Sequence, residues 1–207
     1  MSALASVAKS APLSESELKN LLAAIRQNRT TQADFQAQRV IRLMKKPVVS
    51  SGAVWFQPPN KFRREVKGTS PSITVSDGRE LWIYYPNFKS AERYPLGKGS
   101  PLDATVAAIN SALNLENIET SFNISATKSD TGHELALLPR TAAMKRVFQK
   151  LDLRINNEFR VERTDMLLPN GDRIVTGYSN QTRAPIPSST FEFKPPQGTE
   201  VTTPLGQ

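Results

Sequence analysis

The sequence predicts a mainly β protein, in which one antiparallel sheet forms an unclosed half-barrel with helices over its mouth. Successive β-hairpins follow one another without intervening helices, which indicates an antiparallel meander. Two amphipathic stretches are the predicted helices, and fifteen prolines and ten glycines indicate many turns. About ten strands in one sheet tend to curl, split or close, so a strongly bent sheet is expected.

The first predicted helix spans Ser14–Asn28. Ser14 and Glu17 form a capping box, in which each residue satisfies a backbone donor that the helix leaves unpaired. One apolar stripe follows at helical spacing, made of Leu18, Leu21, Leu22 and Ile25.

The second predicted helix spans Leu102–Leu113. It is rich in alanine and carries a narrow apolar stripe of Leu102, Val106, Ile109 and Leu113. Such a helix can lie on a surface or plug an opening, and an ordinary helix packed on a sheet is equally compatible with the pattern.

Five strands are expected between the two helices. Alternation predicts a long strand at Phe35–Lys45, and Pro58-Pro59-Asn60 separates Ala53–Phe56 from Phe62–Val66. Asp77-Gly78 suits a tight turn between strands at Ile73–Val75 and Leu81–Tyr85.

Five or six strands follow the second helix. The expected segments are Phe122–Ile124, His133–Leu138, a strand with Val147, Leu151, Leu153 and Ile155 on one face, Phe159–Val161, two arms around Pro169–Asp172, and Thr190–Lys194. The tail from Pro195 is polar.

Composition restricts the possible functions. No apolar run approaches the roughly 18 residues that span a bilayer, and the chain of 207 residues has no cysteine and one histidine, His133. We expect one domain over residues 1–207, with flexible ends at 1–12 and 199–207. His133, which opens a strand after a turn, is expected to be a surface residue. Because the sequence does not bring together a nucleophile, a base and an orienting group, we expect that the protein is not an enzyme and that it binds no cofactor and no metal.

The net charge of +8 raises the alternative of a basic nucleic-acid-binding β domain. The candidate residues include Lys45-Lys46, Arg63-Arg64 and Lys145-Arg146. They alternate with apolar or acidic residues, as on the solvated side of a sheet, and no nucleic-acid recognition signature accompanies them. We therefore expect no nucleic-acid partner.

Three segments, residues 52–63, 75–86 and 191–198, together resemble one known family. This family is LolA, the periplasmic outer-membrane lipoprotein carriers. Residues 52–63 (GAVWFQPPNKFR) are similar to its stretch with Trp and Pro-Asn, and residues 75–86 (VSDGRELWIYYP) to its Asp-Gly hairpin. Residues 191–198 (FEFKPPQG) resemble its C-terminal motif. The three segments occur in family order over most of the chain.

The resemblance implies an unclosed antiparallel β half-barrel with helices as a lid over a hydrophobic cavity. It further implies a monomeric periplasmic carrier, with the signal peptide already removed, that takes acylated lipoproteins from an inner-membrane ABC transporter or exporter to an outer-membrane acceptor. A carrier of another lipid, such as a glycolipid or a lipid-linked pigment, is the alternative. The expected cavity and lid residues are Leu21, Ile25, Phe35, Val54, Phe56, Phe62, Leu81, Ile83, Val106, Ile109 and Leu113.

One position departs from the family pattern. Classical members carry an arginine before the Pro-Asn pair that latches the lid, whereas this chain has Pro58, which has no side-chain donor. We expect a lid that rests on apolar contacts, a more open cargo-free state and tighter retention of cargo. A charge at the mouth, Phe62→Glu, is expected to impair loading without unfolding if the side chain is partly exposed.

Overall fold

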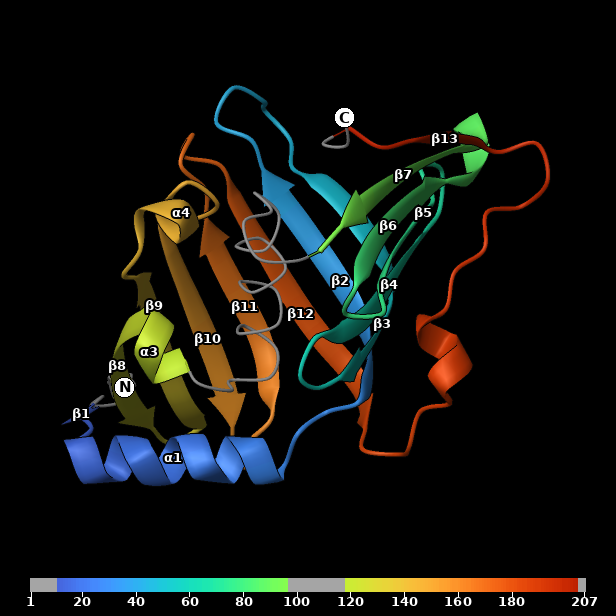
Figure 1. The fold of residues 1–207 in the computed structure, drawn as a ribbon. Helices are drawn as coiled ribbons and strands as arrows, with labels where there is room; N and C mark the ends of the chain where they lie inside the picture. The colour runs from blue at the N-terminus through green and yellow to red at the C-terminus, as the bar shows by residue number, and fades with distance from the viewer. Residues whose placement is uncertain (1–10, 97–117, 205–207) are drawn as a thin grey trace, which may run out of the picture.

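The protein folds as one strongly curved, mainly antiparallel sheet with helices at its ends (Figure 1). The computed structural model describes residues 11–96 and 118–204. Within these residues the strand order is β1-β8-β9-β10-β11-β12-β2-β3-β4-β5-β6-β7-β13. Since β1 and β13 lie at opposite edges, the sheet is an unclosed half-barrel, and the predicted fold class is confirmed.

The first half of the chain supplies one wing of the sheet, from β2 to β7, whereas its first strand, β1, pairs with β8 of the other wing. It contains β1 (Ala11–Pro12), α1 (Glu15–Gln27), β2 (Gln32–Val40), β3 (Val48–Gln57), β4 (Lys61–Lys67), β5 (Ser72–Ser76), β6 (Glu80–Tyr85), the 3-10 turn η1 (Pro86–Phe88) and β7 (Ser90–Pro95). The five strands expected in this half are present as β2–β6, although β2 ends at Val40 rather than at Lys45, and β7 was not expected. Residues 41–47 instead form an exposed loop.

The second half supplies the other wing, from β8 to β12, and its last strand, β13, pairs with β7 at the edge of the first wing. It contains α3 (Ile118–Ser121), β8 (Phe122–Ser129), β9 (Gly132–Pro139), α4 (Ala142–Lys145), β10 (Lys150–Asn156), β11 (Val161–Leu167), β12 (Arg173–Thr182), η2 (Ser188–Phe191) and β13 (Glu200–Thr202). The two wings are joined because β12 pairs with β2, with Tyr178 opposite Phe35.

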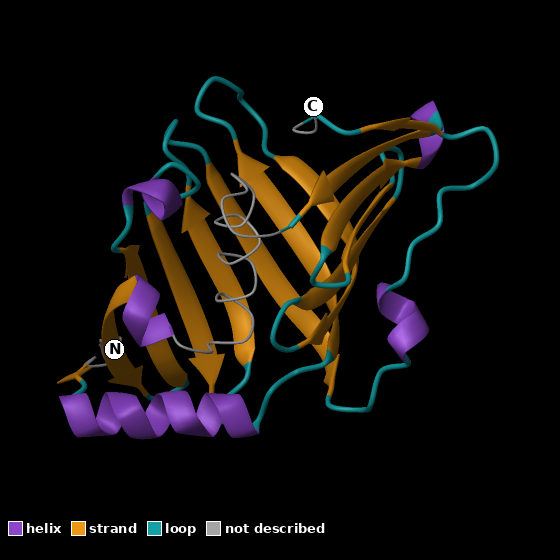
Figure 2. Ribbon diagram, in the orientation of Figure 1, coloured by secondary structure: helices purple, strands orange, loops and turns teal. Residues whose placement is uncertain are grey.

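Helix α1 begins as the sequence predicts. The backbone N–H of Ser14 donates to Glu17 Oε2 at 2.8 Å, and the backbone N–H of Glu17 donates to Ser14 Oγ at 3.4 Å, which completes the capping box. Leu21, Leu22 and Ile25 are its buried residues. The helix lies across one end of β8–β11 (Figure 2), so its apolar stripe covers that end of the interior.

The predicted strand Thr190–Lys194 is wrong. Phe191 ends η2, and the following residues run over the outer face of the sheet without pairing. Phe191 is buried there, and the Phe193 ring lies 5.6 Å from the rings of both Trp82 and Tyr84. The alternating phenylalanines thus cover the back of the sheet instead of extending it. The short β13 pairs in parallel with β7 farther along.

The predicted helix Leu102–Leu113, with Val106, Ile109 and Leu113, lies outside the described residues. Two short helices, α3 and α4, were not expected from the sequence. Both are single turns that supply a buried side chain, Ile118 and Met144, to the core beside α1.

Candidate functional site

The inner face of β2, β3, β4 and β6 carries one buried apolar cluster. Alternate residues of a strand point to the same face, and the register pairs Phe56 of β3 with Phe62 of β4. The buried cluster, here called the wing cluster, consists of Ala33, Phe35, Ala37, Val54, Phe56, Phe62 and Leu81. The structure therefore brings together five of the residues expected at the cavity. Ile83, two residues after Leu81 on β6, is half-buried.

A second buried cluster lies under α1. Leu21 and Ile25 of the helix, the other two described residues expected at the cavity, pack with Leu135, Leu153 and Ile155 of the sheet. The two clusters are separate groups within the same concave face. Expected cavity residues from α1 and from β2–β6 consequently lie in different clusters.

A small cavity lies between the two clusters. It measures about 30 Å³ and is lined by Ile25, Ala33, Phe56, Tyr178 and seven other residues. This volume corresponds to roughly one water molecule's share of the liquid. In the described residues, then, the space between the clusters is too small for an acyl chain, and cargo there requires the clusters to separate.

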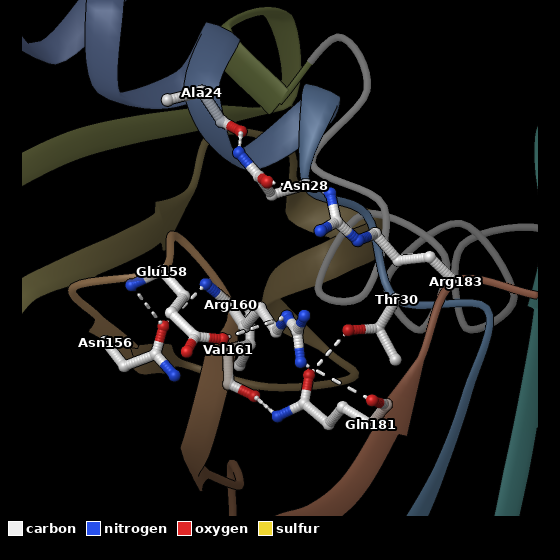
Figure 3. A network of polar contacts seen from close by, with 9 residues as sticks. All are labelled: Ala24, Asn28, Thr30, Asn156, Glu158, Arg160, Val161, Gln181 and Arg183. Atoms are coloured by element: carbon white, nitrogen blue, oxygen red, sulfur yellow. Dashed lines mark hydrogen bonds and ion pairs between the residues drawn. The ribbon is translucent and has the colours of Figure 1, made fainter.

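A polar network closes the rim of this cavity (Figure 3). Arg183 Nη1 donates to Asn28 Oδ1 at 2.9 Å at the end of α1. Thr30 Oγ1 donates to Gln181 Oε1 at 2.5 Å, and Gln181 Nε2 donates to the carbonyl oxygen of Val161 at 2.8 Å. These bonds connect the end of α1 to β11 and β12, so they hold the helix against the sheet at the point where the two clusters meet.

Arg64 places a positive charge on the inner face of the wing. Its guanidinium carbon lies 4.3 Å from the centroid of the Phe35 ring, within the range of a cation–π contact. Burial lowers the pKa of the Arg64 guanidinium from its ordinary value, but arginine stays charged in proteins. Among the described residues no carboxylate forms an ion pair with it.

The sequence had suggested that Arg63-Arg64 belongs to a solvated basic face, which is wrong for Arg64. Arg63 points to the outer face, where its Nε lies 2.7 Å from Glu65 Oε1 and its Nη1 donates to the Thr190 carbonyl at 3.2 Å. Arg64, the next residue, necessarily points to the opposite face. Strand alternation predicts that the two arginines lie on opposite faces, but the sequence did not show which positions of the strand face inward.

Gly52 allows the wing to pack closely. A Cβ atom at this position would lie 1.7 Å from the carbonyl oxygen of Glu65 and 3.0 Å from the Phe35 ring. The glycine that opens the Gly52–Arg63 segment thus permits β4 and the Phe35 ring to approach the β3 backbone. The same segment contains the turn at Pro58, and the lid that Pro58 was expected to affect lies outside the described residues.

His133 is half-buried rather than fully on the surface. Its ring stacks on Phe159 with centroids 6.2 Å apart, and burial lowers its pKa. Over residues 11–96 and 118–204, no three His, Cys, Asp or Glu side chains are grouped to hold a metal ion. None of the helices in these ranges has the length and hydropathy needed to cross a membrane.

The unclosed β half-barrel and its apolar concave face place this protein in the class of open-barrel binding proteins. Comparison with known proteins identifies the family within this class. The model of the outer membrane lipoprotein carrier protein LolA matches residues 26–194. Because this match covers well over half of the chain, the protein belongs to the LolA family.

Two relatives agree with this assignment, and one solved structure shares the fold. An outer-membrane lipoprotein carrier protein of Methylibium petroleiphilum is 30% identical over 154 residues, covering 73% of this chain and 72% of its own. One from Chromobacterium violaceum is 29% identical, covering 92% of this chain and 89% of its own. An uncharacterized conserved protein of Thermus thermophilus shares the fold, with a TM-score of 0.54, 16% identity and coverage of 90% and 99%.

Proposed function

We propose that this protein is a periplasmic carrier that holds the acyl chains of lipoproteins, or of a related lipid, against its concave face. It would pass them from the inner to the outer membrane without covalent chemistry. The implied partners are an inner-membrane ABC transporter or exporter and an outer-membrane acceptor, and we expect the carrier to act as a monomer. Membership of the LolA family and the names of the relatives support this proposal.

The observation that carries the proposal is the division of apolar residues between the two faces of the wing. On the outer face, Trp82 and Tyr84 are covered by Phe193 from the C-terminal segment. On the inner face, the buried wing cluster lies on the concave side of the unclosed sheet. Apolar surface on the inside of an open barrel suits a ligand with long hydrocarbon chains.

Loading requires movement at the rim. Since the cavity between the clusters holds about 30 Å³, an acyl chain can enter there only if α1 moves away from β11 and β12. The bonds of Thr30, Asn28 and Gln181 oppose this movement. We expect Gln181→Ala to raise the rate of probe uptake, because it removes the link between Thr30 and the sheet.

The native tryptophans provide a sharp test of which face binds cargo. Trp55 and Trp82 point to the outer face, because their neighbours Val54 and Leu81 belong to the inner cluster. Brominated palmitate should bind without quenching these two tryptophans, whereas it should quench the added emission of Phe56→Trp. The proposal would be contradicted if the acyl probe failed to bind. It would also be contradicted if the probe quenched the wild-type emission of Trp55 and Trp82 as strongly as the added emission of Phe56→Trp.

A lipid with an acidic group is a second candidate cargo. Acyl chains alone need no cation in their binding site, whereas Arg64 places one beside Phe35 on the inner face. We expect palmitate to bind more tightly than hexadecanol, and Arg64→Met to abolish that difference. Lys67→Gln, an exposed change on the outer face of the same strand, is the matched control.

The nucleic-acid alternative makes a different prediction. A basic nucleic-acid-binding domain would bind oligonucleotides with strong salt dependence and would not bind acyl probes.

Mass spectrometry of lipid extracted from protein purified from its native host identifies the cargo directly, because it requires no choice of probe.

A further inference from the structure

The exposed large hydrophobic residues are concentrated at one end of the half-barrel. All eight of those in the described part of the chain lie in loops or strand ends opposite α1. Five belong to the hairpin between β2 and β3, here called the tip (residues 40–49), and the Leu43 side chain is 95% exposed. The eight are Val40, Leu43, Met44, Val48, Val49, Phe88, Leu138 and Val201.

The same end of the molecule is basic. The connections at residues 41–47, 86–89 and 140–149 contain no Asp or Glu. Their exposed cations include Arg42, Lys45, Lys46, Lys89, Lys145 and Arg146, and no described residue forms an ion pair with any of these six. The turns at the other end mix both signs, with Asp77, Arg79, Asp130, Glu158 and Arg160.

Hydrogen bonds hold the base of the tip in place. Asp172, in the turn between β11 and β12, accepts from Arg39 Nη2 at 2.9 Å and from the Arg42 backbone N–H at 3.2 Å. The Met44 N–H donates to the Ile41 carbonyl at 2.9 Å, which closes a turn within the loop. Asp172 at the base of the tip is therefore occupied by Arg39, and Leu43 and Met44 lie in the exposed loop together with its cations.

We propose that this end of the half-barrel docks on an anionic membrane surface, with the side chains of Leu43 and Met44 entering the lipid interface. Aliphatic side chains surrounded by lysine and arginine are the arrangement by which peripheral proteins bind acidic lipids. A protein partner is favoured less, because a stable interface buries about 800 Å² per partner and a projecting hairpin tip offers little flat surface. This docking does not depend on the identity of the cargo.

Vesicle flotation of the full-length, cargo-free protein tests the proposal. We expect it to float with vesicles of phosphatidylcholine and phosphatidylglycerol at low salt, but not with phosphatidylcholine alone, and to be released at high salt. Lys45→Gln combined with Lys46→Gln should weaken binding by about 25-fold, taking about fivefold for each neutralised lysine. Lys61→Gln combined with Arg79→Gln removes the same charge at the opposite end and should leave binding within about twofold of the wild type.

Insertion is tested separately by fluorescence. Leu43→Trp should show a blue-shifted emission, relative to the wild-type background, when vesicles containing phosphatidylglycerol are added. Arg79→Trp should show no shift. All of these positions are exposed or at the surface of turns, so the variants should keep the circular dichroism spectrum of the wild type.

Three results would overturn the proposal. These are absence of binding to vesicles with phosphatidylglycerol, an equal loss of binding in the Lys61 and Arg79 control, and a dimer in solution that protects Leu43→Trp from a soluble quencher. Because no acyl probe is used, these failures are distinct from failure of the proposed carrier function.

Discussion

The contact between Arg64 and Phe35 makes a quantitative prediction. The variants are Phe35→Leu, Arg64→Met and the double mutant, and the measured quantity is the free energy of unfolding in urea. At 4.3 Å the guanidinium is well inside the roughly 6 Å limit of a cation–π contact. Such contacts contribute about 0.5–1 kcal/mol when exposed and about 2 kcal/mol when desolvated, so a half-buried Arg64 should give a coupling energy of about 1 kcal/mol.

The single variants have different expected costs. The Phe35 side chain is 3% exposed, and a swap to leucine in a packed site costs about 1–1.5 kcal/mol. Arg64→Met loses the ring contact but also removes the desolvation of a buried charge, so its net effect should be small. The double mutant is then expected to be less destabilised than the sum of the two singles.

The control cycle pairs Phe35→Leu with Lys67→Met, because Lys67 is exposed and on the outer face of the same strand. Distant sites add to within about 0.3–0.5 kcal/mol. Additivity of Phe35 and Arg64 within that limit would refute the reasoning, since it would mean that the ring does nothing to stabilise the charge inside the half-barrel.

Three further predictions concern the stability of the sheet around the site. Gly52→Ala places a Cβ 1.7 Å from the Glu65 carbonyl oxygen, so we expect a loss of about 4 kcal/mol or more, or no folded protein, by urea unfolding; near-wild-type stability would contradict it. Phe191→Ala should cost about 3–5 kcal/mol because this ring of the C-terminal segment is buried, and a cost below about 1 kcal/mol would mean that the segment does not pack on the sheet. The hydrogen bond from Arg39 lowers the pKa of Asp172, so its contribution is present above the unfolded-state pKa of about 3.9. The stability difference from Asp172→Asn should therefore shrink as the pH falls through the pKa of the folded state, and a difference that stays constant at acid pH would exclude this role.

Local chemistry explains which elements could be predicted from the sequence. Asp77 predicted a turn because its short carboxylate can bond to nearby backbone, and its Oδ1 accepts from the N–H groups of Arg79 and Glu80 at 2.7 and 2.8 Å. The capping box predicted the start of α1 for the same reason. These signals involve only residues close together in the sequence, so they do not depend on the tertiary contacts of the rest of the chain.

Signals that depend on distant residues were less informative. The alternation of Phe191 and Phe193 is the same whether a segment pairs in a sheet or packs on its back, and here it packs on Trp82 and Tyr84. Because Arg63 and Arg64 are neighbours in the sequence, both were assigned to one basic face, although their side chains lie on opposite faces of β4. The grouping of the wing cluster could be anticipated, because alternate residues of a strand share a face, but alternation alone does not tell which face is the inner one. The division into two clusters was not predictable, since it depends on the pairing of β12 with β2.

Phe62 shows how burial changes an experiment designed from the sequence. The side chain is 2% exposed and lies beside Phe56 in the wing cluster, so Phe62→Glu would bury a carboxylate and should destabilise the fold instead of affecting only loading. A buried glutamate can have its pKa raised by about 4 units, which corresponds to about 5 kcal/mol above the raised pKa and to about 3.7 kcal/mol at pH 7. Because the pKa would be raised in the folded state, stability should be greatest at acid pH and fall as the pH rises through that pKa. Arg64 lies two residues away on the same face, so Phe62→Glu combined with Arg64→Met should be less stable than Phe62→Glu alone. If Phe62→Glu instead unfolds in urea like the wild type at both pH 5 and pH 8, the side chain is accessible to water and belongs to the cavity mouth.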